Sequence, residues 1–234
     1  MILTNPKYFQ QRPVAFPWND LKTINLGGAR HYLDVNGNAH PSVTTVLSIL
    51  SRGDISEWRR AVGAEEADRV SRRAVTRGTA VHDLVEKYLQ NKLDSDLSKI
   101  MPLHLEGFLS IRQELDRAVD NVMNLECAVV SSIVRMGGRI DCVAEHAGEP
   151  AIIDFKTSGR FKSKKDITSY FLQMTAYSLM YEEVTSIPIK KLVVIMSVDS
   201  HKDPLVFIER PQKWYNKLIA VRKEYDKDRM FGRI

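Results

Sequence analysis

Apolar residues recur at the 3.6-residue spacing of an amphipathic α-helix along several stretches of the chain. These stretches are residues 55–90, 103–120, 164–183 and 211–230. In the first stretch Val62, Ala67 and Val70 set the repeat, and we expect at least two helical pieces there. Gly78-Thr79 interrupts the repeat, so we predict the joint between the pieces at this point.

Shorter apolar and β-branched runs predict strands. They are residues 126–135, the two sides of a hairpin closed around Gly148-Glu149, residues 191–198 and residues 205–209. Gly137-Gly138 is expected to turn the chain from the first strand into the hairpin, which gives three antiparallel strands in a row. Residues 91–98 are polar and predict a loop.

The N-terminal region shows little periodicity, and residues 1–30 predict an arm or irregular cap. Residues 31–38 contain Asn36-Gly37, which favours a small hairpin, and Ser42 is placed to cap a short helix. We expect one α/β domain over residues 1–234, with an N-terminal arm and helical portion over 1–120 and a core of sheet and helices over 121–234. No signal peptide or apolar span is visible, and we expect no contact with membranes and a cytoplasmic location, in a bacterial or phage-infected host cell.

The hairpin carries the candidate chemistry. With Gly148-Glu149 at its turn, Asp141 lies opposite Lys156 and Val143 lies opposite Asp154, so Asp141, Asp154 and Lys156 share one face of the sheet. Ile153 and Phe155 then face the other way and pack on a helix. Two neighbouring carboxylates repel each other unless a cation lies between them, and their oxygens suit Mg2+ or Mn2+. The alternative is a surface Asp–Lys pair with an unrelated edge carboxylate.

Charge and cysteine content narrow the function classes. The net charge is +5, which fits a polyanionic partner only weakly, but the cations are unevenly placed. One arginine cluster is Arg52, Arg59, Arg60, Arg69, Arg72, Arg73 and Arg77, and a second cluster of lysines and an arginine follows the hairpin at 156–165. Each cluster could equally well be a solvent-exposed face without a binding partner. The two cysteines, Cys127 and Cys142, are too few for a four-cysteine iron–sulfur cluster.

Four motifs in order give the chain a family resemblance. They are Gly78-Thr79-Ala80-Val81-His82, Gly138-Arg139-Ile140-Asp141, Asp154-Phe155-Lys156-Thr157-Ser158 and Gln173-Met174-Thr175-Ala176-Tyr177. The series resembles the PD-(D/E)XK nuclease superfamily, in its RecB-like branch. With the opening at residues 41–47 and the helical region around Trp58, the chain looks most like the group of mitochondrial genome maintenance exonucleases and phage-encoded exonucleases. Ile140 stands where the family name has proline.

The resemblance implies a restriction-endonuclease-like core, with a mixed central sheet flanked by helices. It also implies that Mg2+, with Mn2+ as a substitute, is bound by Asp141, Asp154 and the Phe155 carbonyl, with His82 as a further metal ligand or as a residue that supports the ligands. Lys156 would position the attacking water or the phosphate. Without the resemblance, His82 would be a core histidine of a helix face. Glu126 lies where some relatives carry a further acidic residue.

The same resemblance implies nucleic-acid contacts. Gln173 and Tyr177 would contact DNA or orient Lys156, and Thr157 and Ser158 would meet the phosphate backbone. Arg77 and Arg139 are further candidates for phosphate, although a surface strand residue is an equal interpretation of Arg139. Candidate stacking aromatics are Trp58, Tyr88, Phe108, Tyr170 and Phe171, although most aromatics in such helices are core residues.

These features predict a metal-dependent DNA exonuclease that prefers single-stranded DNA with free ends and acts in replication, repair or recombination. In the mitochondrial relatives a helical arch admits one strand, and residues 55–90 would serve that purpose here. The alternatives are a 5′–3′ duplex exonuclease of a phage recombination system, and a non-catalytic DNA-binding module with a degenerate nuclease fold. A factor that acts through protein contacts is a further class, with replication or recombination proteins as partners. The residues leave the polarity of cleavage and the oligomeric state open.

Overall fold

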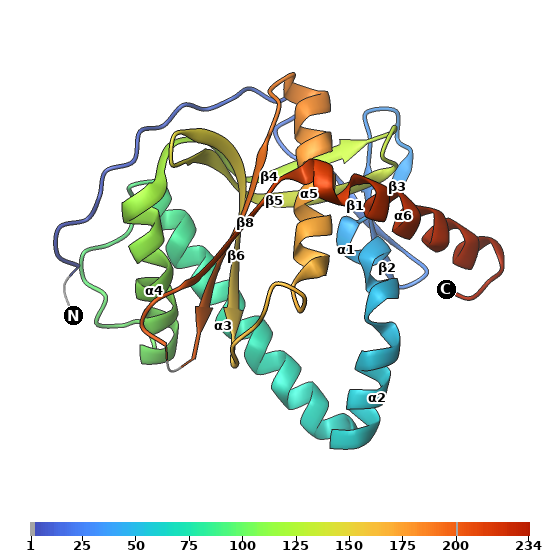
Figure 1. Ribbon diagram of the computed structural model, residues 1–234, viewed down its shortest axis with the longest axis horizontal. Helices are drawn as coiled ribbons and strands as arrows, with labels where there is room; N and C mark the ends of the chain where they lie inside the picture. Colours follow the sequence, from blue (N-terminus) through green and yellow to red (C-terminus); the bar gives the residue numbers. More distant parts are fainter. Residues whose placement is uncertain (1–2, 200) are drawn as a thin grey trace.

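A five-stranded mixed sheet with helices on both faces forms the centre of the molecule in a computed structural model, which describes residues 3–199 and 201–234 (Figure 1). The strands are β4 (Val119–Ser131), β5 (Met136–His146), β6 (Glu149–Ser158), β7 (Lys191–Val198) and β8 (Leu205–Glu209), hydrogen-bonded in that order. Only the β6–β7 pair is parallel, since the long α5 connection lies between them. The expected mixed α/β sheet flanked by helices is confirmed.

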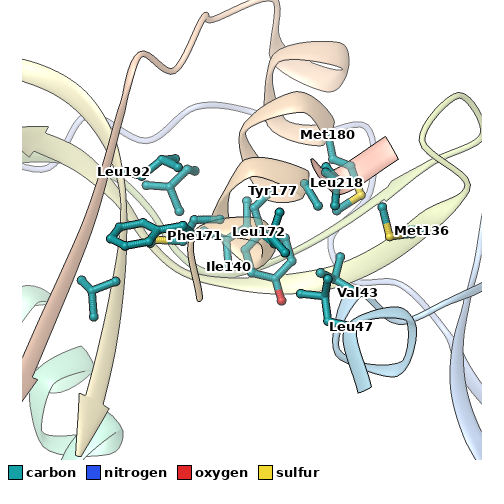
Figure 2. Close-up of a cluster of buried hydrophobic side chains, with 14 of the residues drawn as sticks. Val43, Leu47, Met136, Ile140, Phe171, Leu172, Tyr177, Met180, Leu192 and Leu218 are labelled. Carbon is teal, nitrogen blue, oxygen red and sulfur yellow. The ribbon is translucent and has the colours of Figure 1, made fainter. Parts of the chain in front are cut away.

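The helices divide between the two faces. Their bounds are α1 (Val43–Leu47), η1 (Ser48–Leu50), α2 (Arg52–Val62), α3 (Ala64–Leu89), α4 (Pro102–Ala118), α5 (Thr168–Thr185), η2 (Pro211–Trp214) and α6 (Tyr215–Met230). Helices α3 and α4 cover one face, where Ile153 and Phe155 of β6 join their buried apolar residues, as predicted. Helices α1, α5 and α6 cover the other face, where Ile140 packs with Phe171 and Tyr177 (Figure 2).

The N-terminal region is more ordered than expected. A small antiparallel sheet contains β1 (Thr23–Leu26), β2 (Ala29–Leu33) and β3 (Ala39–Pro41). The hairpin predicted around Asn36-Gly37 joins β2 to β3, whereas β1 lies in the segment expected to be irregular. Ser42 caps α1, because its hydroxyl accepts the backbone N–H of Thr45 at 3.0 Å. Before β1, residues 10–12 run along the edge of β4 at Val122.

Two helix boundaries differ from the prediction. Helix α3 runs without interruption through Gly78-Thr79, and the joint with α2 is Gly63 (φ 85°, ψ 151°), a backbone conformation that favours glycine. Helix α5 begins at Thr168 rather than at Lys164, after a turn over residues 164–167. Part of the chain expected to begin that helix is therefore a loop beside the sheet.

Gly137 and Gly138 do not form a turn but lie inside β5. The turn is at residues 132–135, where the Ser131 hydroxyl accepts the N–H groups of Ile133 and Val134. The two glycines are needed for space: an added Cβ would lie 2.6 Å from Tyr32 at position 137 and 2.4 Å from Tyr177 at position 138. Residue type alone therefore misplaced this turn.

The register of the β5–β6 hairpin also differs from the prediction. The turn is Ala147-Gly148, both with positive φ, and the last ladder pair towards the site is Cys142 with Ile153. Asp141 is therefore level with Asp154, not with Lys156. Moving a two-residue turn by one position shifts the register by two, so Ile153 and Phe155 keep their predicted face.

No helix in the described part of the chain is both long enough and apolar enough to span a membrane.

Candidate active site

Asp141 lies where the β5–β6 ladder ends. Its Oδ2 accepts the backbone N–H of Phe155 at 3.1 Å, a bond that replaces the next backbone pair of the ladder. The side chain is 14% exposed, so the carboxylate is held by the sheet but still reaches solvent. The position is the junction at which β6 leaves β5 and continues only along β7.

His82 reaches this carboxylate from the buried half of α3. Its Nδ1 lies 3.6 Å from Asp141 Oδ2, and its Nε2 lies 2.7 Å from the carbonyl oxygen of Phe155. Because a carbonyl only accepts, Nε2 carries the proton, and the lone pair of a neutral ring is on Nδ1, towards Asp141. The Phe155 carbonyl thus orients the histidine, an arrangement common for metal-binding histidines.

Glu126 completes a group of three side chains. Ligand atoms of His82, Glu126 and Asp141 all lie within 4.8 Å of one another. Glu126 has φ 46° and interrupts the β4–β5 ladder between the Leu125–Cys142 and Cys127–Ile140 pairs, opposite Asp141. Burial, then the charge of Asp141, raises the pKa of Glu126 to about 7. A strained backbone and a raised pKa together mark this glutamate as more than a surface residue.

Asp154 and Lys156 form a separate ion pair, with Nζ 2.5 Å from Oδ2. Asp154 is only 3% exposed, and burial raises its pKa even beside the ammonium group; the charge of Asp141 adds to the rise. Burial alone would lower the pKa of Lys156, but the Asp154 and Asp141 carboxylates outweigh it and hold that pKa above its usual value. Asp154 is not part of the three-residue group with His82.

Helix α5 carries Tyr170, Gln173 and Tyr177, the first of which contacts Lys156. The Lys156 ammonium lies 5.1 Å from the centre of the Tyr170 ring, a cation–π contact. Gln173 Nε2 donates to the Tyr177 hydroxyl at 3.2 Å. The Tyr177 side chain is buried on Gly138, and burial raises its pKa, so the hydroxyl stays neutral. We therefore assign Tyr177 a packing position beside the site rather than a contact with DNA.

Three of the remaining candidates, Arg139, Arg77 and Ser158, already have partners within the protein. Arg139 donates to the Glu126 carbonyl and, at 2.8 Å, to Asp20, while Arg77 pairs with Asp199. The Ser158 hydroxyl bonds the backbone of Arg160, whereas half-buried Thr157 lies near Gly78 of α3.

Most of the candidate stacking aromatics are core residues. Tyr88, Phe108 and Phe171 are fully buried, and Tyr170 is engaged by Lys156 and Lys162. Trp58 on α2, at 37% exposure, remains available. Cys127 and Cys142 are unpaired thiols next to the site, and burial raises the pKa of both.

The donor set suits a divalent metal ion. One imidazole nitrogen and two carboxylates converge, and a cation there would offset the Asp141 charge that adds to the effect of burial on the pKa of Glu126. Nitrogen and oxygen donors of this kind bind Mg2+, Mn2+ and other first-row divalent ions.

Comparison with known proteins identifies the class. A family model of the PD-(D/E)XK nuclease superfamily matches residues 93–223, more than half of the chain, and the chain therefore belongs to this superfamily. Proteins of the superfamily use divalent metal ions in hydrolysing nucleic acids. Asp141, Asp154 and Lys156 lie in the matched segment, and His82 precedes it.

One relative is mitochondrial genome maintenance exonuclease 1 of Homo sapiens, 29% identical over 156 residues. The aligned region is 60% of this chain and 43% of the human protein, so the chain spans less than half the length of that relative. A crystal structure of a candidate exonuclease from Eubacterium rectale matches with a TM-score of 0.46 and 12% identity, over 64% of this chain and 65% of that chain.

Proposed function

We propose that this nuclease is a metal-dependent DNA exonuclease that hydrolyses single-stranded DNA from free ends, in replication, repair or recombination. The observation that carries the proposal is the convergence of His82, Glu126 and Asp141 beside the Asp154–Lys156 pair. A site built only for binding phosphate would gain nothing from carboxylates, since they repel the ligand. The human relative is named an exonuclease, which favours action from DNA ends.

His82, Glu126 and Asp141 would hold the metal, with Asp154 and the Phe155 carbonyl as further predicted ligands. Mg2+ is the expected ion, and Mn2+ the substitute. When bound, such an ion lowers the pKa of a water molecule and offsets charge on a phosphoryl group. Glu126 must lose its proton to take part, and with a pKa of about 7 it does so near neutral pH.

Lys156 supplies fixed positive charge next to these carboxylates. Its ammonium remains protonated near neutral pH, because Asp154 and Asp141 raise its pKa. A fixed cation stabilises the negative charge that grows on phosphate oxygens in the transition state of hydrolysis. Asp154 and the Tyr170 ring hold the ammonium in place on two sides, so little reorganisation is needed during reaction.

The preference for single strands rests on α2 and the first half of α3, which we call the arch (residues 52–79). The arch extends away from the sheet (Figure 1) and carries the N-terminal arginine cluster. Arg72 and Arg73 are exposed, and Trp58 on α2 offers an aromatic face. Cationic side chains with an exposed aromatic suit a flexible single strand, whose bases stack on aromatic rings. Passage of a strand through the arch would require a free end.

A digestion series tests the proposal. Matched single-stranded and blunt duplex DNA, labelled at either end and blocked at 5′, 3′ or both ends, is incubated with Mg2+ or Mn2+. We expect rapid loss of unblocked single strands, no reaction when both ends are blocked, and no reaction with Lys156→Ala. Matched RNA measures selectivity for DNA.

Three outcomes contradict parts of the proposal. Faster digestion of blunt duplex would favour the duplex exonuclease. Cleavage of doubly blocked strands would make the enzyme an endonuclease. DNA binding without cleavage by either ion, with Lys156→Ala indistinguishable from wild type, would favour the non-catalytic binding module.

A further inference from the structure

Two adjoining hollows on the α2 side of the molecule share Ser48 and Arg52. The first, called the helix hollow, lies along one face of α2 up to Gly63 and is also lined by Arg59 and Arg60. The second, called the turn hollow, has a volume of about 480 Å3 and lies between the β1–β2 turn, the end of α1 and the end of α6. Neither contains a residue of the carboxylate site.

The turn hollow is basic. Its lining includes Arg52, Arg229 and Arg233, and no Asp or Glu side chain is among its described lining residues. Arg52 and Arg229 are exposed and, in the part of the chain that the structure describes, have no carboxylate within 4 Å. Arg233 lies 3.3 Å from Asp228, so one of the three charges is partly offset.

Polar groups complement these cations. The hydroxyls of Thr45 and Ser48 line the turn hollow, together with His31. His31 is only 2% exposed, and its Nδ1 lies 2.9 Å from the Ala29 carbonyl. Its Nε2 has no hydrogen-bond partner among the described residues. This buried, unpartnered nitrogen belongs to a residue that lines the same hollow as the three arginines.

Open space borders the glycines of the β1–β2 turn, which line the hollow. Gly27 and Gly28 have φ values of 59° and 79°, and a Cβ at either position would meet nothing within 4 Å. Guanidinium groups around an accessible cavity match the geometry of phosphate oxygens, which they bind through paired N–H donors.

We propose that the turn hollow binds a phosphate group of a nucleic-acid strand, and that the helix hollow continues this contact along α2. The inference rests on the proposed function for the identity of the polymer. Helix α2 has 11 residues and is about 16 Å long. A ligand that fills both hollows must therefore be an extended polyanion rather than a mononucleotide. Arg52, which belongs to both hollows, is the joint between them.

The test is a pair of double variants with equal change in charge. Arg229→Ala/Arg233→Ala removes two arginines of the turn hollow, and Lys217→Ala/Lys223→Ala removes two exposed lysines of the same helix, outside it. Anisotropy of a fluorescein-labelled oligothymidylate is measured in EDTA over a salt series. We expect about tenfold weaker binding by the arginine variant, with a salt slope smaller by about 2, and about twofold or less for the lysine variant.

An equal loss in both double variants would overturn the proposal, because it would show a general effect of net charge. Arg229→Gln/Arg233→Gln repeats the measurement with side chains that keep polar surface, and thermal unfolding confirms that each variant folds. The single variant Arg52→Ala should weaken binding by about as much as the arginine pair, since it affects both hollows.

Two further experiments extend the test. The first distinguishes free phosphate from nucleic acid as the ligand, and the second distinguishes this proposal from the proposed function. Calorimetry with inorganic phosphate that shows binding to wild type, together with unchanged oligonucleotide affinity in the arginine variant, would assign the hollow to free anions and overturn the nucleic-acid assignment. Hydrolysis of thymidine 5′-p-nitrophenyl phosphate with Mn2+ should be equal in wild type and the arginine variant. If wild type fails to hydrolyse any substrate, the proposed function fails, while a selective loss of oligonucleotide affinity still supports the turn hollow.

Discussion

The two halves of α3 differ in how many of their side chains are buried. Between Val81 and Leu89 the helix buries several apolar side chains against β6 and α4, and His82 of this half reaches the sheet. From Ala64 to Thr79 it buries only Ala67, and its partner α2 buries no residue. Charged and exposed apolar residues, Val75 among them, cover this projecting part. A continuous helix thus joins a buried segment beside the candidate site to an arch with few buried side chains, for which we expect low local stability.

This contrast separates two kinds of function. Rate should depend on side chains fixed by the sheet, since their positions are set by burial and by the ladder. Substrate capture should depend on the arch and its charges, which have few packing partners. Substitutions in the two regions should therefore affect different measured quantities, and the following experiments are ordered from the largest expected effect to the smallest.

The strongest test of the rigid region is Asp141→Asn. The amide keeps the shape but removes the charge between His82 and the Phe155 N–H group. We expect kcat to fall by about 10³-fold or more, with a melting temperature close to that of wild type. Asp203→Asn, an exposed loop residue, is the matched control and should retain full activity. Comparable activity in the two variants would remove Asp141 from the site.

Stability should differ just as clearly along α3. Leu89→Ala removes a fully buried side chain, and we expect a loss of about 2–5 kcal/mol in the free energy of unfolding. Val75→Ala, at 67% exposure on the same helix, should change it by less than about 0.5 kcal/mol. Urea unfolding measures both. Equal losses would mean that the arch is packed as firmly as the sheet region.

Glu126 should make the free energy of unfolding depend on pH. Its pKa is raised to about 7 in the folded protein from an ordinary 4.5, so its contribution to stability is complete below about pH 4.5 and is lost as pH rises through 7. Without metal, Glu126→Gln should therefore gain about 2 kcal/mol relative to wild type between pH 4.5 and pH 8. Urea unfolding at each pH in EDTA measures this gain, and a pH-independent difference would contradict it. Added Mg2+ should reduce the gain.

The arch should show the smallest effects, and only with polymeric substrate. Arg72→Ala/Arg73→Ala removes two exposed charges, and we expect KM for single-stranded DNA to rise about three- to tenfold. Thymidine 5′-p-nitrophenyl phosphate should be hydrolysed at the wild-type rate. A fall in kcat with this small ester would show that the arch also shapes the catalytic site.

The sequence predicted most elements and the family, because helical periodicity, β-rich runs and ordered motifs are local signals. It also predicted the faces of β6. The hairpin register was wrong by two, because Ala147, rather than Glu149, occupies the turn with φ 50°, which residue type disfavours. Motif order placed His82 near the carboxylates, although a helical histidine alone would have suggested the core.

What the sequence could not predict depends on tertiary contacts. The left-handed backbone of Glu126 and the ring of Tyr170 over Lys156 follow from how β4 and α5 meet the hairpin. The charged partners of Arg77 and Arg139 lie 122 and 119 residues away in the chain. An acidic residue at a single strand position carries no periodic signal, so only the family resemblance pointed to Glu126.

The close contact between Gly138 and Tyr177 restricts which residues homologous proteins can carry at these two positions. The Tyr177 ring occupies the volume that a side chain at position 138 would need. The residue types at these two positions therefore depend on each other. A relative that gains alanine at the first position should carry a smaller residue at the second. Exchanging only one of them between such homologues should tilt α5 and weaken catalysis, whereas exchanging both should preserve it.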